Sequence, residues 1–222
     1  MLKDLLLHLL RTPGRLLRSR RESRVWSDLE SAVADFNEKN YEDVIAHCRT
    51  ALEQEPRSAQ ANYLCGRALM ELDRHAEAAP YLRAATDADP GFAEAHADLA
   101  LVMLKAGDYH AAERLCRQAV LIQPKAPRYR LHLAEILEST GRDREALDEL
   151  LIAQEYAPEQ LDVLQTLIIK MDQLGMYAEA LRVAERARAE LGETFETWFF
   201  LGYARFSSGD HRGAVEACRR AI

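Results

Sequence analysis

Apolar residues recur along most of this chain at intervals of three and four residues, the spacing of one face of an α-helix. Near residue 100, one such stretch is marked by Leu99, Ala100 and Met103. A second stretch follows, marked by Ala112, Leu115, Cys116 and Ala119. Ala106-Gly107-Asp108 lies between them, and its glycine provides a helix C-cap. The pattern therefore predicts two antiparallel helices joined by a short turn.

The same pattern returns every 34 residues along the chain, in four aligned columns, and we call this interval the repeat period. Proline marks the end of a unit at Pro56, Pro90, Pro124 and Pro158. Glycine marks the turn at Gly107, Gly141, Gly175 and Gly209. Alanine fills two columns, Ala78, Ala112, Ala146, Ala180, Ala214 and Ala85, Ala119, Ala153, Ala187, Ala221. Four columns that share one repeat period indicate an internal structural repeat.

Small residues in the alanine columns allow the two helices of a unit to approach closely. A single helical hairpin cannot bury its apolar face alone, so consecutive hairpins must stack on one another. The sequence therefore predicts an all-α fold in which antiparallel helix pairs form a solenoid.

The repeated residues resemble the tetratricopeptide repeat, which has W-x-x-L-G in its first helix and small and large apolar positions in its second. The last unit carries this pattern in Trp198, Leu201, Gly202, Ala214 and Cys218. The second unit carries it in Cys65-Gly66, Ala78, Leu82, Ala85 and Pro90. The resemblance implies a right-handed superhelical solenoid of about six repeats over residues 25–222, which acts by binding other polypeptides.

The units are divided as 25–58, 59–92, 93–126, 127–160, 161–194 and 195–222. The first unit departs from the pattern, and its best apolar stripe leaves a turn from Asn37 to Asn40 that is one residue shorter than the others. The last unit is truncated, because it stops at Ile222 inside its second helix. We expect either that the natural chain continues or that a partner covers this end, since solenoids usually need a polar cap.

Residues 1–24 form a basic, leucine-rich leader with a net charge of +5, whereas the remainder carries −12. Its leucines share one face of a short helix that Pro13-Gly14 ends: Leu2, Leu5, Leu6, Leu9 and Leu10. The apolar run is too short to span a membrane and lacks a signal-peptide cleavage site. Three interpretations stay open, namely a loose basic tail, docking onto this or another protein, and contact with anionic lipid.

A stripe at i, i+3, i+7 and i+10 of each first helix is expected to line a concave groove. Over five units it holds six carboxylates and two arginines, and it also exposes aromatic and aliphatic residues. Such a groove suits a polypeptide with basic and apolar residues. The alternative is that some of these side chains contact neighbouring repeats. The candidate partner-binding residues are Tyr63, Arg67, Met70, Leu101, Leu104, Arg128, Leu131, Glu135, Glu138, Ile169, Asp172, Phe199, Tyr203 and Phe206.

The sequence contains no phosphate-binding loop, nucleophile elbow or His-Glu-x-x-His pair, so no catalytic, cofactor or metal residue is assigned. Cys48, Cys65, Cys116 and Cys218 are expected to be buried free thiols. The net charge of −7 argues against nucleic-acid binding. The prediction is a cytoplasmic scaffold or adaptor that is not an enzyme. The alternatives are the recruiting module of a longer bacterial glycosyltransferase-, sulfotransferase- or methyltransferase-type enzyme, and an assembly factor held at the inner membrane by its leader.

Overall fold

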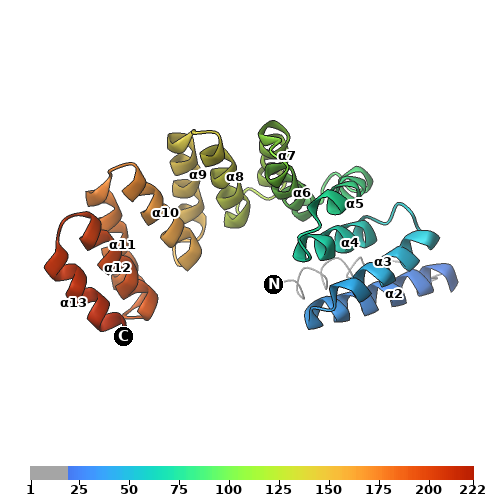
Figure 1. The fold of residues 1–222 in the computed structure, drawn as a ribbon, viewed down its shortest axis with the longest axis horizontal. Coiled ribbons are helices and arrows are strands. Elements are labelled where there is room, and N and C mark those ends of the chain that lie inside the picture. The colour runs from blue at the N-terminus through green and yellow to red at the C-terminus, as the bar shows by residue number, and fades with distance from the viewer. Residues whose placement is uncertain (1–19) are drawn as a thin grey trace. The chain divides into compact units, whose positions relative to one another are not determined.

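The computed structural model of this chain describes residues 20–222, which form twelve α-helices in six consecutive pairs (Figure 1). The first helices of the pairs are α2 (Arg20–Glu38), α4 (Ala59–Glu71), α6 (Ala93–Lys105), α8 (Pro127–Ser139), α10 (Leu161–Gln173) and α12 (Phe195–Ser207). The second helices are α3 (Tyr41–Gln54), α5 (His75–Ala88), α7 (Tyr109–Ile122), α9 (Asp143–Tyr156), α11 (Tyr177–Leu191) and α13 (His211–Ala221). The predicted all-α solenoid of helix pairs is confirmed.

The turn inside each pair repeats one geometry. Its central residue has a positive φ, which glycine adopts without strain and which occurs at Gly107, Gly141, Gly175 and Gly209. The next residue donates its backbone N–H to a carbonyl five residues earlier, a bond that closes the helix end. These donors are Asn40, Arg74, Asp108, Arg142, Met176 and Asp210, each one repeat period after the last.

The turn between α2 and α3 follows the same repeat period as the later turns, although its sequence departs from the pattern. Only Lys39 and Asn40 separate α2 from α3, one residue fewer than in the other pairs, as expected. The expected start of the turn at Asn37 is wrong, because α2 continues to Glu38. Lys39 nevertheless has a φ of 64°, and Asp73, which lies one repeat period later, has 58°. The shorter turn therefore comes from one extra residue at the end of α2, and the repeat period continues through it.

The described chain forms two compact units, one ending at Ile122 and the other spanning Gln123–Ile222. In both units the residues of the alanine columns are buried, apart from the half-buried Ala221. The two helices of a pair approach closely at Gly66 of α4, where an added Cβ would lie 2.7 Å from Cγ of Leu82. Small residues at these positions therefore allow the helices of a pair to pack closely.

Three cysteines are buried as predicted, but the prediction for Cys218 is wrong. Cys48, Cys65 and Cys116 are free and buried, and burial raises the pKa of the Cys65 thiol to about 11. Cys218 is exposed, because it lies on α13, the last helix described, and no later helix packs over it. Its thiol is therefore open to reagents that cannot reach the other three.

The predicted leader falls mostly outside the described residues. Helix α2 begins at Arg20, so residues 20–24 belong to the first helix of the array. The expected helix of Leu2 to Leu10 lies outside the residues that the structure describes. Over residues 20–222, no helix is both long and apolar enough to cross a membrane.

Candidate protein-binding surface

In the first unit, Tyr63 does not lie on an open surface. It is 2% exposed, and its ring packs against Phe92 with 4.7 Å between the ring centroids. Burial raises its pKa well above the ordinary value for tyrosine, and the neighbouring Asp98 carboxylate adds to this effect. The expectation that Tyr63 is exposed to a ligand is therefore wrong. Its side chain packs α4 against the start of the next repeat.

Arg67 is held by the same carboxylate. Its Nη1 donates to both oxygens of Asp98 at 3.2 and 3.1 Å, and its Nη2 donates to Glu71 at 3.0 Å. Burial alone would lower the pKa of Arg67, but Asp98, Tyr63 and Glu71 raise it. Asp98 belongs to α6 and its side chain is 6% exposed, so this ion pair joins two neighbouring first helices. The other candidate residues of this unit, Met70, Leu101 and Leu104, are half-buried.

In the second unit, Lys170 was not predicted and binds one of the candidate residues. Its ammonium lies 2.8 Å from Glu138 of α8 and 3.0 Å from Asp143 of α9, although the side chain is only 4% exposed. Burial alone would lower the pKa of Lys170, and its hydrogen bonds to these two carboxylates raise it. Glu138 therefore serves to hold α8 to the next repeat.

Asp172 and Tyr203 form a similar link between repeats. The Tyr203 hydroxyl donates to Asp172 at 2.8 Å, which joins α12 to α10. This hydrogen bond is the main reason that the pKa of Tyr203 is raised, with burial as a second cause. The remaining candidates of α8 differ in exposure, since Arg128 and Leu131 are half-buried and Glu135 is exposed.

Three phenylalanines on α12 are exposed to solvent. Phe195, Phe199 and Phe206 are 59%, 46% and 63% exposed, and Phe195 stacks on Phe199 with 6.2 Å between centroids. Together with the half-buried Tyr203 they form what we call the aromatic row. Phe195 was missed, because it lies outside the i, i+3, i+7, i+10 stripe, although its spacing of four from Phe199 was a visible signal. Ile169 of α10, which packs against α12, is a further exposed apolar residue.

The aromatic row borders an apolar cavity of about 510 Å³ between α12 and α13. Exposed aromatic side chains beside an apolar hollow are typical of protein-binding surfaces. The cavity is lined by residues that include Phe199, Tyr203, Phe206, Val215, Cys218 and Ile222.

Sequence models of known families match most of the chain. One tetratricopeptide repeat model matches residues 36–102, 70–130 and 103–168, and a second matches residues 172–222. The chain belongs to the tetratricopeptide repeat family. No curated protein gives a significant match to this tetratricopeptide repeat chain.

Solved structures with the same fold include PilF of Pseudomonas aeruginosa, which is 15% identical, has a TM-score of 0.74, and is matched over 90% of each chain. YrrB, described as a TPR protein with an unusual peptide-binding site, is 17% identical with a TM-score of 0.59, over 79% of this chain and 90% of its own. MamA is 14% identical with a TM-score of 0.56, over 86% of this chain and 91% of its own. At these identities the likeness establishes the fold alone.

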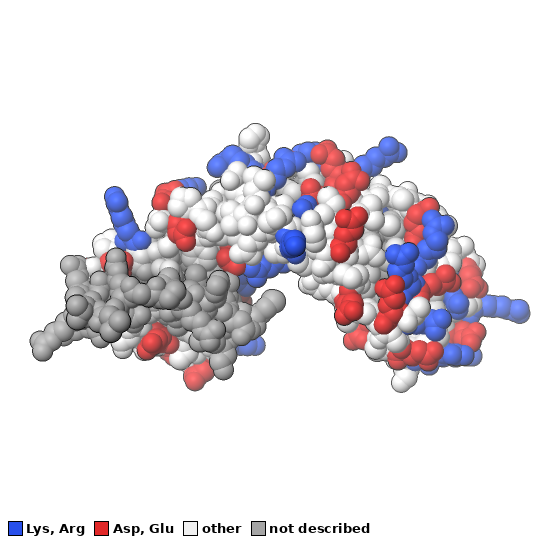
Figure 2. Space-filling model, turned by 180° about the vertical axis from the view of Figure 1, so that it is seen from behind, with Lys and Arg blue, Asp and Glu red and all other residues white. Residues whose placement is uncertain are grey.

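Charge on the second unit is mixed in sign. Figure 2 shows lysine and arginine interspersed with aspartate and glutamate over the face of this unit that is turned to the viewer. Within residues 20–222, no group of three or more His, Cys, Asp or Glu side chains is placed to hold a metal ion.

Proposed function

We propose that this chain is a protein-binding scaffold of the cytoplasm and that its aromatic row is the principal contact for the partner. The observation that carries the proposal is the exposure of Phe195, Phe199 and Phe206 on one helix. Large aromatic side chains are usually buried in a folded protein, and at interfaces they contribute much of the binding free energy. The division into a leader and six repeats from residue 25 is part of this proposal.

Exposed carboxylates on α12 and α10 favour a ligand that carries basic as well as apolar residues, although Arg219 of α13 also lines the neighbouring cavity. Glu196 of α12 and Asp162 of α10 are both exposed. By contrast, Asp172 and Glu138 bind Tyr203 and Lys170 and are less available to a ligand. An amphipathic segment could place apolar side chains on the phenylalanines and lysine or arginine beside the exposed carboxylates.

The leader of this chain has the same chemistry as the proposed ligand. Residues 1–24 carry +5 and several leucines, whereas the rest of the chain carries −12. We therefore include in the proposal that the leader docks on the acidic body of its own chain or of a second copy. Deleting residues 1–19, which end before α2, should then raise the affinity for any ligand of the aromatic row. An unchanged affinity would exclude leader docking and leave the scaffold role intact.

Affinity capture from a lysate of the source organism tests the main proposal. The full chain should capture a protein that the variant Phe199→Ala/Phe206→Ala does not retain. The variant Leu121→Ala/Leu151→Ala is the matched control, because it also removes two exposed apolar side chains, from α7 and α9. Equal capture by all three chains would contradict a role for the aromatic row.

A further inference from the structure

The fourth residue of each first helix from α4 onward comes six residues after the position that ends the preceding repeat, which is a proline in every case but the last. These residues are Asn62, His96, Arg130, Leu164 and Trp198. The first three place a side-chain nitrogen within 3.1 to 3.4 Å of a proline carbonyl six residues earlier. Leucine has no N–H group in its side chain, so Leu164 cannot make the equivalent bond to Pro158.

The equivalent positions one repeat before and one repeat after Leu164 carry large side chains, Arg130 and Trp198. Trp198 is 7% exposed and lies between Arg188 and Arg220, whose guanidinium carbons are 5.0 and 5.1 Å from its ring. Arg130 forms an ion pair with Glu149 and lies 5.8 Å from the ring of Tyr156. Each of these two positions is therefore occupied by a side chain that matches its surroundings.

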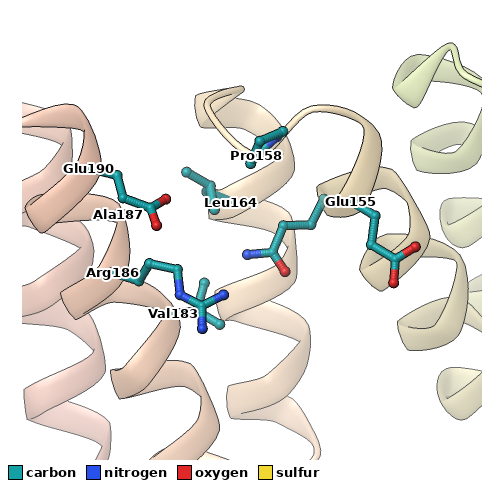
Figure 3. Close-up of a pocket in the computed structure, with 8 residues that line it drawn as sticks. Glu155, Pro158, Leu164, Val183, Arg186, Ala187 and Glu190 are labelled. Carbon is teal, nitrogen blue, oxygen red and sulfur yellow. The ribbon is translucent and has the colours of Figure 1, made fainter.

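At the position between them, the short side chain of Leu164 leaves a cavity of about 320 Å³ open to the surface, which we call the Leu164 notch. Leu164, Val183 and Ala187 form its apolar wall, and Pro158 also borders it. Figure 3 shows Arg186 and Glu190 projecting from α11 beside this wall.

Two positions of the notch lining, Arg186 and Val183, correspond to residues that surround Trp198 and Arg130, and its polar lining also includes Gln154, Glu155 and Glu190. Arg186 stands one repeat period before Arg220, which stacks on Trp198. Val183 stands one repeat period after Glu149, which binds the guanidinium of Arg130. The notch therefore contains Arg186, the counterpart of the arginine that stacks on Trp198. It has Val183 in place of Glu149, the carboxylate that pairs with Arg130.

We propose that the Leu164 notch binds an aromatic side chain, tryptophan above all, from a partner polypeptide. The ring would stack on Arg186 and lie against Leu164, Val183 and Ala187, as Trp198 does on Arg220 one repeat later. The indole N–H would find an acceptor in the Pro158 carbonyl or in Glu190, which phenylalanine cannot use. This site rests on the proposed role in polypeptide binding, but it lies on different helices from the aromatic row.

Methyl-detected NMR of the full chain, titrated with N-acetyltryptophanamide, tests the proposal. The methyl resonances of Leu164 and Val183 should shift and saturate, and N-acetylargininamide should shift them less at equal concentration. Arg186→Ala should weaken the binding of the tryptophan derivative by about two- to fivefold, which is the effect of losing one cation–π contact. Arg182→Ala, one turn away on α11 and 69% exposed, should leave the affinity unchanged.

Two further variants separate the possible failures. Leu164→Trp should fill the notch from within and abolish the shift at Val183, provided that circular dichroism shows a folded chain. Phe199→Ala/Phe206→Ala should bind the probe at the notch like the wild type, whatever becomes of the aromatic row. The proposal is overturned by unshifted Leu164 and Val183 methyls, by an equal or stronger response to the arginine derivative, or by equal weakening in Arg186→Ala and Arg182→Ala.

Discussion

Replacing Arg67 by leucine removes the cation that binds the Asp98 carboxylate across two repeats. The Asp98 side chain is 6% exposed and that of Arg67 is 30% exposed. Removing one partner of a fully buried ion pair costs roughly 3–5 kcal/mol, because the remaining charge stays buried without compensation. Water can reach the exposed side of this pair, so we expect Arg67→Leu to lower the free energy of unfolding by about 3 kcal/mol, at the low end of that range.

The double variant Arg67→Leu/Asp98→Leu should recover most of this loss. Leucine already occupies the equivalent positions of neighbouring repeats, as Leu101 and Leu64. Replacing both members of a buried pair by apolar residues is often close to neutral. Because Asp98 also accepts a hydrogen bond from the buried Tyr63 hydroxyl, every chain in this comparison carries Tyr63→Phe, and the double variant should then lie within ~1 kcal/mol of the Tyr63→Phe parent. A large coupling free energy between the two substitutions would assign Arg67 a structural role.

Urea unfolding followed by circular dichroism measures these differences, and hydrogen exchange in α4 and α6 locates them. The control is Arg117→Leu, whose ion pair with Glu113 lies within one helix and whose arginine is 49% exposed. That control should cost no more than about 0.5 kcal/mol. If Arg67→Leu is no more destabilising than Arg117→Leu, the ion pair does not hold the repeats together, and Arg67 returns as a candidate for ligand binding.

Three other predictions concern the turns, the thiols and the buried lysine. Asp73→Gly should raise the unfolding free energy by about 0.5 kcal/mol in thermal or urea unfolding, because glycine accepts the positive φ that Gly107 adopts one repeat later. Iodoacetamide should alkylate Cys218 first in the folded chain, as followed by mass spectrometry, whereas the buried Cys65, with its raised pKa of about 11, should react only after unfolding. The folded-state pKa of Lys170 is raised, so its contribution to stability should be complete below the ordinary value of 10.5 and be lost as the pH rises through the folded value; urea unfolding of Lys170→Met should lack this alkaline loss. A lower unfolding free energy for Asp73→Gly would contradict the argument from φ. Alkylation of all four thiols at similar rates would contradict the argument from burial. The same loss of stability at alkaline pH in Lys170→Met would contradict the argument from the lysine pKa.

The framework of this fold was predictable because it depends on local, repeated signals. The turn requires a residue with a positive φ, and glycine fills this position in four successive repeats, at Gly107, Gly141, Gly175 and Gly209. The alanine columns mark close helix contacts in the same period. Each of these two patterns reflects a requirement of the backbone or of one pair of helices, so it can be recognised without knowledge of the contacts with the neighbouring repeat.

The candidate site was harder to predict, because its residues bind partners in another repeat. Arg67 binds Asp98 and Tyr203 binds Asp172, and in both cases the two residues are 31 positions apart. A stripe of positions assigned on each helix separately leaves out contacts between repeats, so it treats such residues as available to a ligand. Complementary groups at that separation were visible in the sequence and would have identified Arg67 and Tyr203 as links between repeats. Phe199 and Phe206 were recognised as candidates from their positions on the stripe, but their exposure depends on which helices cover α12.

The central claim, that the aromatic row binds an amphipathic polypeptide segment, is tested most directly by peptide selection followed by affinity measurement. Peptides selected from a displayed random library on the full chain should combine apolar and basic residues. The dissociation constant of a selected peptide should rise about tenfold or more in Phe199→Ala/Phe206→Ala, as expected for interface anchors, and stay unchanged in Leu121→Ala/Leu151→Ala. Equal affinities for all three chains, or a loss confined to the control variant, would contradict the claim.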